Sequence, residues 1–227
     1  FDKFELKNIC FKYSNDQQEI LKNINLTIKR GDKIGIIGKS GAGKTTLVDI
    51  ILGLLDQSQG SKLLNNGELI DGSKDWQNII AYVPQDVFLL DDTLKSNVAF
   101  GVKEEKIDNE KLLLSLSKAQ LKDLVQNRKH GINTSLGEGG LKISGGQRQR
   151  VGIARALYSD PDVIIFDEAT SSLDHMTESK ILDEIELNLK GKTIIMITHR
   201  ENSLKFFDKI YEIKDSMLIT KKKSVNE

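Results

Sequence analysis

The sequence predicts an α/β protein with a largely parallel core, an antiparallel β subdomain and an inserted α-helical subdomain. Apolar strand-like runs alternate with helix-like segments in residues 1–85 and 156–215, a pattern typical of strands joined by crossover helices. Between them, residues 86–155 carry few strand signals and leucines at helical spacing. We therefore expect one domain over 1–227 that ends in a C-terminal tail at 216–227.

The first elements are expected to be strands. Alternating apolar residues around Phe4–Ile9 and again at Leu26–Ile28 favour two of them, with a turn at 14–18. Lys33–Gly38 is a continuous apolar run that enters a glycine-rich loop. Lys44–Leu52 has helical spacing and stops at a glycine.

A hairpin signal follows this helix. Asn66-Gly67 lies between Ser61–Leu64 and Glu68–Ile70, which predicts a β-hairpin. Ile79–Val83 predicts a further strand. After the helical subdomain we expect, in order, a helix from Gly145, a strand at Val163–Asp167, a helix near Glu178–Leu189, strands at Thr193–Thr198 and Lys209–Ile213, and a mobile polar end from Lys221.

Composition bears on the partners of the protein, its redox compartment and its relation to the membrane. The 33 basic and 33 acidic residues cancel, which removes the simplest argument for nucleic-acid binding but leaves room for a local patch. The single Cys10 cannot form an internal disulfide, so a reducing compartment is expected. No apolar run approaches the roughly 20 residues of a membrane span. Because the chain begins with Phe1, we expect it to be part of a longer protein.

Residues 38–46 read GKSGAGKTT and fit the phosphate-loop pattern completely. Glycines let the backbone bend so that successive N–H groups face phosphate oxygens, while the lysine adds a positive charge. The hydroxyl of Thr45 is suited to hold Mg²⁺. The nucleotide-binding residues predicted here are Gly38, Lys39, Ser40, Gly41, Ala42, Gly43, Lys44, Thr45 and Thr46.

Two acids end the apolar run VIIF. We expect the strand of Asp167 to lie beside the strand that enters the phosphate loop, where this carboxylate would hold Mg²⁺. Successive strand residues point to opposite faces, so Glu168 is better suited to act as a general base toward the attacking water. The alternative is a solvent-facing acid pair at a strand end.

A second phosphate site is predicted at residues 144–147. Ser144 is suited to cap a helix, but Gly145 and Gly146 each cost it about 1 kcal/mol relative to alanine. That cost is understandable if bare N–H groups, followed by Gln147, must approach an anion. A chain with two phosphate sites for one nucleotide suggests that the second site serves a neighbouring copy.

With these motifs in place, the chain resembles the nucleotide-binding domain of an ATP-binding cassette (ABC) transporter over nearly all of residues 1–215. GKSGAGKTT, ISGGQ and FDEA occur in the order of that family. The resemblance implies a P-loop NTPase core of the RecA-like type. It also implies ATP and Mg²⁺ as cofactors, ATP hydrolysis, and a head-to-tail pair of domains with ATP between the phosphate loop of one and the ISGGQ segment of the other.

The resemblance assigns further positions one by one. Tyr13 matches the aromatic that stacks on adenine, with a core aromatic as the alternative. Gln85 matches the glutamine that reaches Mg²⁺ or water, and Asp174 matches an aspartate at the dimer interface. His199 matches the histidine that contacts the γ-phosphate. Lys44 and Glu168 complete the catalytic set, whereas His130 and His175 match no such position and are expected at the surface.

Departures from the family pattern are small. Ile143 stands where leucine is usual, Ser172 where alanine is common, and Glu201–Ser203 where the family often has Leu-Ser-Thr. None of these changes removes a charged or phosphate-facing group. We therefore expect a competent ATPase site.

The exporter branch of the family is favoured. Residues 134–139, TSLGEG, resemble a segment that in exporters meets the membrane domains. Val87–Leu90 is apolar enough to receive a coupling helix of a transmembrane domain, with packing between the two lobes as the alternative. The amino-acid sequence of the motifs is most similar to that of bacterial lipid or lipid-linked glycan flippases. This resemblance implies that the domain lies at the cytoplasmic face of the inner membrane. Alternatives are a non-transport ABC ATPase that acts on nucleic acid or ribosomes and a stand-alone importer subunit.

Overall fold

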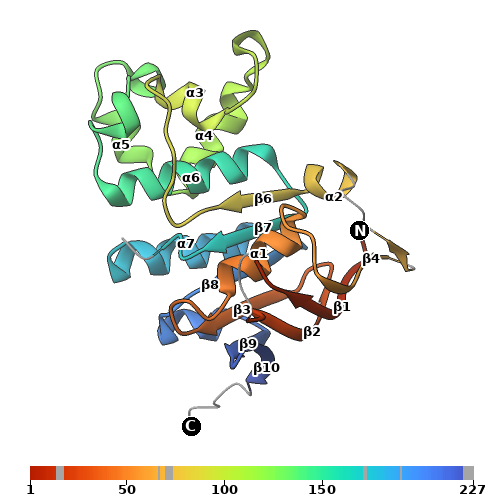
Figure 1. Ribbon diagram of the computed structural model, residues 1–227. Helices are drawn as coiled ribbons and strands as arrows, with labels where there is room; N and C mark the ends of the chain where they lie inside the picture. The colour runs from red at the N-terminus through yellow and green to blue at the C-terminus, as the bar shows by residue number, and fades with distance from the viewer. Residues whose placement is uncertain (14–17, 66, 70–73, 171–172, 190, 222–227) are drawn as a thin grey trace. The chain divides into compact units, whose positions relative to one another are not determined.

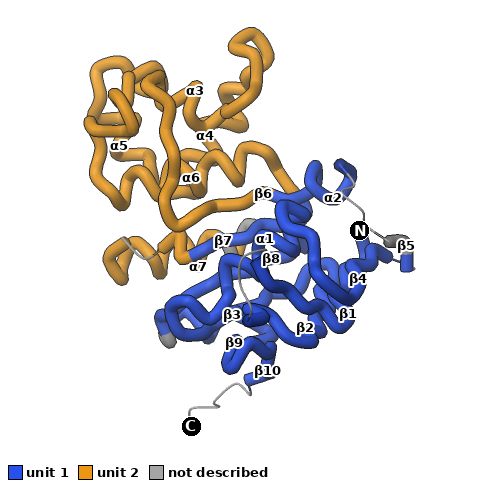
Figure 2. The backbone as a smooth tube through the Cα atoms, in the orientation of Figure 1, with its two compact units in different colours: residues 1–80, 162–167, 191–227 blue, residues 81–161, 168–190 orange. Residues whose placement is uncertain are grey.

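The computed structural model divides into two compact units, coloured separately in Figure 2: unit 1 is residues 1–80, 162–167 and 191–227, and unit 2 is residues 81–161 and 168–190. Within 1–227 the structure describes every residue except 14–17, 66, 70–73, 171–172, 190 and 222–227. The expected turn at 14–18, the centre of the Asn66-Gly67 turn, Ser172 and the polar end of the chain therefore lie largely outside the described residues.

Unit 1 contains an antiparallel sheet in the order β2-β1-β4-β5. Its strands are β1 (Lys3–Phe11), β2 (Leu21–Lys29), β4 (Gln59–Leu64) and β5 (Glu68–Leu69). Leu64 pairs with Glu68, so the predicted hairpin is confirmed. Gly60 lies against β1, where an added Cβ would come within 2.5 Å of the Asn8 carbonyl oxygen.

Unit 1 also contains a sheet in which β10, β9, β3, β8 and β7 follow one another (Figure 1). These strands are β3 (Lys33–Gly38), β7 (Val163–Asp167), β8 (Thr193–Ile197), β9 (Lys209–Lys214) and β10 (Met217–Lys221). Every residue of β7 and β8 is buried, which explains why both read as unbroken apolar runs.

One sequence expectation about this sheet is wrong. The strand of Asp167 does not neighbour β3, because β3 pairs with β8 and β9, and β8 in turn pairs with β7. In a parallel sheet, crossover connections can skip a strand, so the order in the sheet does not follow from the order of motifs in the chain.

The helical segments among the described residues of unit 1 are α1 (Lys44–Leu52), α2 (Lys74–Asn78) and the 3₁₀ segment η4 (Glu201–Phe206). α1 ends as predicted, with Gly53 in the left-handed conformation at φ 71°. α2 has no sequence prediction. It places Trp76 in the core, where its ring stacks on Phe4 at 4.5 Å and its Nε1–H donates to the Ile51 carbonyl.

Unit 2 is mainly helical, as the sequence predicts. β6 (Ile80–Val83) leads into it, followed by α3 (Leu94–Val98), α4 (Asn109–Lys118), α5 (Lys122–Gln126), α6 (Gly145–Ser159) and α7 (His175–Asn188), with 3₁₀ turns η1 (Glu104–Lys106), η2 (Gly131–Asn133) and η3 (Glu138–Gly140). α3 and α4 pack on α6 (Figure 1). Among the described residues, no helix combines the length and apolarity that a bilayer crossing needs.

Candidate functional site

The loop between β3 and α1 is shaped by its glycines. Gly38, Gly41 and Gly43 have φ of 155°, 76° and 99°, values that other residues adopt only with strain. At Gly43 space adds a second constraint, because a Cβ would come within 2.9 Å of the Ile20 side chain. The loop therefore curves as a phosphate-binding loop must.

The start of α1 is suited to an anion. Gly43 occupies the N-cap position without a side-chain cap, and a helix start of this kind favours an anionic ligand. Lys44 is 6% exposed, and its ammonium group donates to the carbonyl oxygens of Gly38 and Lys39 at 3.0 and 2.9 Å. This side chain thus ties both ends of the loop together and brings a positive charge inside it.

Two of the three predicted metal ligands, Thr45 and Asp167, meet in unit 1. The Thr45 hydroxyl donates to a carboxylate oxygen of Asp167 at 3.3 Å, although one strand separates β3 from β7. Asp167 is buried. A hydroxyl and a carboxylate at this separation fit a hard, oxygen-preferring cation such as Mg²⁺, whose charge would stabilise phosphate oxygens there.

Sequence reasoning missed a third oxygen-bearing residue near this pair. Asp49 follows Thr45 by one helical turn, which places both on one face of α1. Burial, together with the charge of Asp167, raises the pKa of Asp49. The spacing i, i+4 from the phosphate-loop threonine is the signal that would have found it.

Glu168 and His199 follow the ends of two parallel strands. Glu168 comes directly after β7 and has φ 48°, an uncommon conformation for a residue with a side chain. His199 is exposed and lies two residues after the end of β8. Residues outside the carboxyl ends of parallel strands are where α/β proteins bind ligands.

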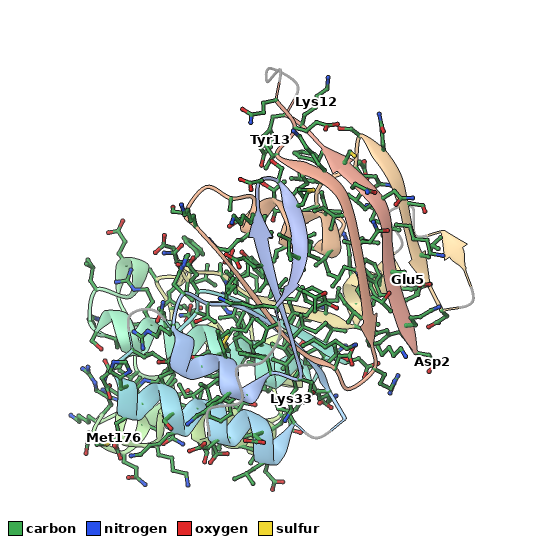
Figure 3. All side chains as sticks on the ribbon, turned by 90° about the horizontal axis from the view of Figure 1, so that it is seen from below. Asp2, Glu5, Lys12, Tyr13, Lys33 and Met176 are labelled. Carbon is green, nitrogen blue, oxygen red and sulfur yellow. The ribbon has the colours of Figure 1, made fainter. Side chains whose placement is uncertain are left out.

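Tyr13 lies just after β1, beside Lys12 and at the opposite end of the strand from Asp2 (Figure 3). Its ring contacts Phe11 edge to face with centroids 4.9 Å apart, and its hydroxyl lies 3.3 Å from the Thr46 hydroxyl. Tyr13 as a whole remains 43% exposed. It is therefore not a core aromatic, and it lies next to the first turn of α1.

A cavity of about 660 Å³ adjoins the outer side of the phosphate loop. It is lined by residues 18–20, 39–42 and 212–216, which come from the segment before β2, the loop itself and the β9–β10 hairpin. Its lining is partly polar and partly apolar, so unit 1 is hollowed beside the predicted nucleotide site.

In unit 2, Ser144 begins α6 with a reciprocal cap. The Ser144 hydroxyl accepts from the Gln147 N–H at 3.2 Å, and the Gln147 side chain accepts from the Ser144 N–H at 3.0 Å. Ser144 and Gly145 are exposed, and an added Cβ at Gly145 would meet nothing within 4 Å. The helix start is accessible and carries no side chain beyond the cap.

Arg150 fixes the first turn of this helix. Its guanidinium donates to the carbonyl oxygens of Gly146 and Gln120. Gln120 lies two residues after the end of α4 and has a left-handed φ of 57°. The ISGGQ segment is therefore anchored to the helical part of unit 2 by a charged side chain.

Asp174 and Gln85 have structural partners of their own. Asp174 precedes α7 and caps it, because its carboxylate accepts from the N–H and the hydroxyl of Thr177 at 2.9 and 2.7 Å. The hydrogen bond from the Thr177 hydroxyl is the first cause that lowers the pKa of Asp174. Gln85 is exposed, and its backbone carbonyl accepts from the Gln149 side chain at 3.3 Å. His130 and His175 are exposed, as expected.

The apolar segment 87–90 alternates. Val87 and Leu89 are buried, whereas Phe88 and Leu90 are 69% and 36% exposed. The Phe88 carbonyl accepts from Arg155, whose guanidinium also lies over the ring of Phe100, itself 51% exposed. Phe88, Leu90 and Phe100 are here called the apolar patch. One half of the segment thus packs inward, and the other half is left exposed for a partner.

Residues 134–139 are held to the start of α3. Thr93 and Ser135 form an isolated antiparallel bridge, and the Leu94 N–H donates to the Thr134 carbonyl. Gly137, Gly139 and Gly140 have φ of 75°, 54° and 77°. The chain therefore bends sharply between this segment and ISGGQ, with Leu136 buried.

Residues 21–171 match the family model described as ABC transporter. The chain is 37% identical over 215 residues to an ATP-dependent lipid A-core flippase of Ralstonia nicotianae, which covers 94% of this chain and 36% of that protein. It is 38% identical over 205 residues to a leukotoxin translocation ATP-binding protein of a Pasteurella haemolytica-like species, which covers 90% of this chain and 29% of that protein.

Among solved structures, the chain is similar to a bacterial Atm1-family ABC exporter with ATP bound, with a TM-score of 0.88 and 32% identity. This match covers 96% of the chain and 38% of the exporter. The chain therefore spans about a third of the length of the relatives that it matches.

Proposed function

Because this chain belongs to the ABC transporter family and is its ATPase domain, we propose that two copies close head to tail on two Mg·ATP and that this cycle powers an exporter. One observation carries the proposal. A single chain presents two helix starts suited to anions. One is at Gly43, beside the ammonium group of Lys44, and the other is at the exposed, capped Ser144. Each copy would then contribute half of each ATP site.

In this mechanism the residues divide the work. Lys44, Ser144, Gly146 and His199 neutralise the γ-phosphate, the last three helping to close the site. Thr45, Asp167 and Gln85 would hold Mg²⁺, which would supply positive charge to the phosphate oxygens. Glu168 orients a water for in-line attack and accepts its proton. Tyr13 stacks on adenine, the backbone of residues 38–46 and 144–147 binds phosphates, and Asp174 lies at the contact between copies.

The first test replaces the proposed general base. Glu168→Gln keeps size and hydrogen bonding but cannot accept the proton, so the turnover number should fall by about 10²–10⁴-fold while Mg·ATP still binds. Phosphate release and calorimetric ATP titration measure the two quantities. Glu105→Gln, an exposed acid of η1, is the matched control and should turn over like wild type. Turnover of Glu168→Gln within a few-fold of wild type would contradict the assignment.

The second test addresses the shared site. Ser144→Ala removes the hydroxyl that would face the partner's nucleotide, so ATP-dependent dimerisation should weaken more than ATP binding to the monomer. Loss of an N-cap also costs a helix about 1 kcal/mol. Thermal unfolding therefore has to accompany sedimentation analysis with ATP. Equal losses in monomer binding and dimerisation would argue against a site completed by a second copy.

The transport role follows from similarity and from the apolar patch. Exposed apolar side chains grouped as Phe88, Leu90 and Phe100 are typical of an interaction surface, and a coupling helix of a transmembrane domain is the proposed occupant. The domain would then lie at the cytoplasmic face of the inner membrane. The names of the relatives, which include lipid A-core flippases, support a lipid or lipid-linked glycan as the transported substrate. Zero net charge gives no support to a nucleic-acid partner.

A further inference from the structure

The hydroxyl of Tyr13 has a partner that base stacking does not need. It lies 3.3 Å from the hydroxyl of Thr46, which is 33 residues away in the chain. Thr46 is 7% exposed and belongs to the first turn of α1. Tyr13, which is proposed to stack on adenine, is thus connected to the first turn of α1, which is proposed to bind the phosphates.

The Tyr13 side chain is well placed to act on Thr46. Its ring contacts Phe11, which is 6% exposed and belongs to the core of the antiparallel sheet. The backbone before it is held by the Lys12 N–H, which donates to the Ser58 hydroxyl at 3.3 Å. The contacts of Phe11 and of the Lys12 backbone therefore anchor Tyr13 to the antiparallel sheet, and its phenolic group lies next to α1.

Thr46 is a residue on which such a contact has consequences. A threonine in a helix divides between two rotamers, because its hydroxyl can also bond to a carbonyl of the preceding turn. A phenol is the more acidic partner of the pair and the better donor. A hydrogen bond from the Tyr13 hydroxyl to the Thr46 hydroxyl selects one rotamer of Thr46. The Thr46 hydroxyl can then donate its own hydrogen bond to a phosphate oxygen. Two consecutive hydrogen bonds of this kind strengthen each other.

We infer that Tyr13, through its hydroxyl, positions Thr46 for binding the phosphate chain, so that this side chain contributes to phosphate affinity independently of the base. Tyr13 is in this respect a positioning residue. The inference rests on the proposed ATP site and deepens it. This role can be distinguished from stacking by measurement. The affinity for a polyphosphate that has no adenine should still depend on the Tyr13 hydroxyl.

The test uses the whole chain and two ligands, Mg·ATP and Mg·tripolyphosphate, titrated by calorimetry. Tyr13→Phe keeps the ring and removes the hydroxyl, so tripolyphosphate affinity should fall by about two- to ten-fold, the range of one net hydrogen bond. Thr46→Val, which keeps the shape, should show a similar loss, and Thr46→Ser should restore most of the affinity. The double variant Tyr13→Phe/Thr46→Val should bind no more weakly than Thr46→Val alone.

Controls separate the possible failures. Tyr211→Phe on β9 removes a phenolic hydroxyl from another strand of the same unit and should leave both affinities unchanged. If Tyr13→Phe binds tripolyphosphate as wild type does while ATP binding is intact, or if the two losses simply add, the inference is overturned. If the wild-type chain bound neither ligand, the proposed function would fail instead. Should Thr46→Val not fold, the tripolyphosphate affinity of Tyr13→Phe decides alone.

Discussion

Asp49 is an acid held where its charge is disfavoured. Burial, and then the charge of Asp167, raise its pKa from 3.8. A carboxyl group with a higher pKa in the folded than in the unfolded chain binds more protons when folded. Its contribution to the free energy of unfolding is therefore complete below pH 3.8 and is lost as the pH rises through the raised pKa.

We expect Asp49→Asn to abolish this loss. The variant should gain stability relative to wild type as the pH rises from about 4 toward neutrality, and the difference should then stay constant. Urea unfolding at a series of pH values, with a chelator and without nucleotide, measures it. Asp75→Asn, an exposed acid of α2, serves as control. A difference that does not change with pH would show that Asp49 is not an electrostatic burden in the folded chain.

Among the elements, α6 depends on a close approach to the segment after β6. At Gly152 an added Cβ would lie 2.6 Å from a methyl carbon of Val87, and Val87 is itself buried. Alanine in a helix gains roughly 0.5–1 kcal/mol over glycine, whereas overpacking costs typically 1–3 kcal/mol. The second effect is typically the larger, so Gly152→Ala should lower the free energy of unfolding by about 1 kcal/mol.

A double-variant cycle tests the cause. Val87→Ala removes the methyl groups that the new Cβ would meet, so Gly152→Ala/Val87→Ala should cost less than the sum of the two single changes. Chemical denaturation of the four proteins gives the comparison. Strict additivity would mean that Gly152 is required for another reason than its contact with Val87.

The elements also show what a sequence can and cannot predict. The strands β3, β7 and β8, the glycine-ended α1 and the capped α6 were predictable because burial on both faces, turn residues and caps leave local patterns. β10 left none, since Met217 and Ile219 are both about half exposed, and the strand depends on pairing with β9. α2 has only five residues.

In the candidate site, too, the parts with a local sequence pattern were predictable and the parts that depend on tertiary packing were not. The phosphate loop follows from a local motif. The contact of Thr45 with Asp167 joins two such motifs that are 122 residues apart, and it forms although the two strands are not neighbours as expected. The position of β8 between β3 and β7, the bond between Tyr13 and Thr46 and the electrostatic effect on Asp49 depend on tertiary packing. No spacing rule along the chain fixes such contacts between distant residues.

At the scale of the whole molecule, the two helix starts are the feature to be explained. α1 begins at a phosphate loop with its own lysine, whereas α6 begins at an exposed, reciprocally capped serine. Suppose that each ATP lies between α1 of one copy and α6 of the other. In a pair with a defective α1 start in one copy and a defective α6 start in the other, both defects then fall in the same ATP site, and the other ATP site is intact. Two variants, each impaired at a different place, can then complement each other.

We therefore expect a mixture of Lys44→Ala and Ser144→Ala chains to hydrolyse ATP faster than either alone. A mixed pair has one site with both defects and one with neither. Because random pairing makes about half of the pairs mixed, an equimolar mixture should reach about a quarter of the wild-type rate per chain, if sites act independently. Phosphate release at fixed total protein measures this. A control mixture of Lys44→Ala with Lys44→Ala/Ser144→Ala should stay inactive, since no pairing restores an intact site. A mixture no faster than the mean of its components would mean that each chain completes its own site.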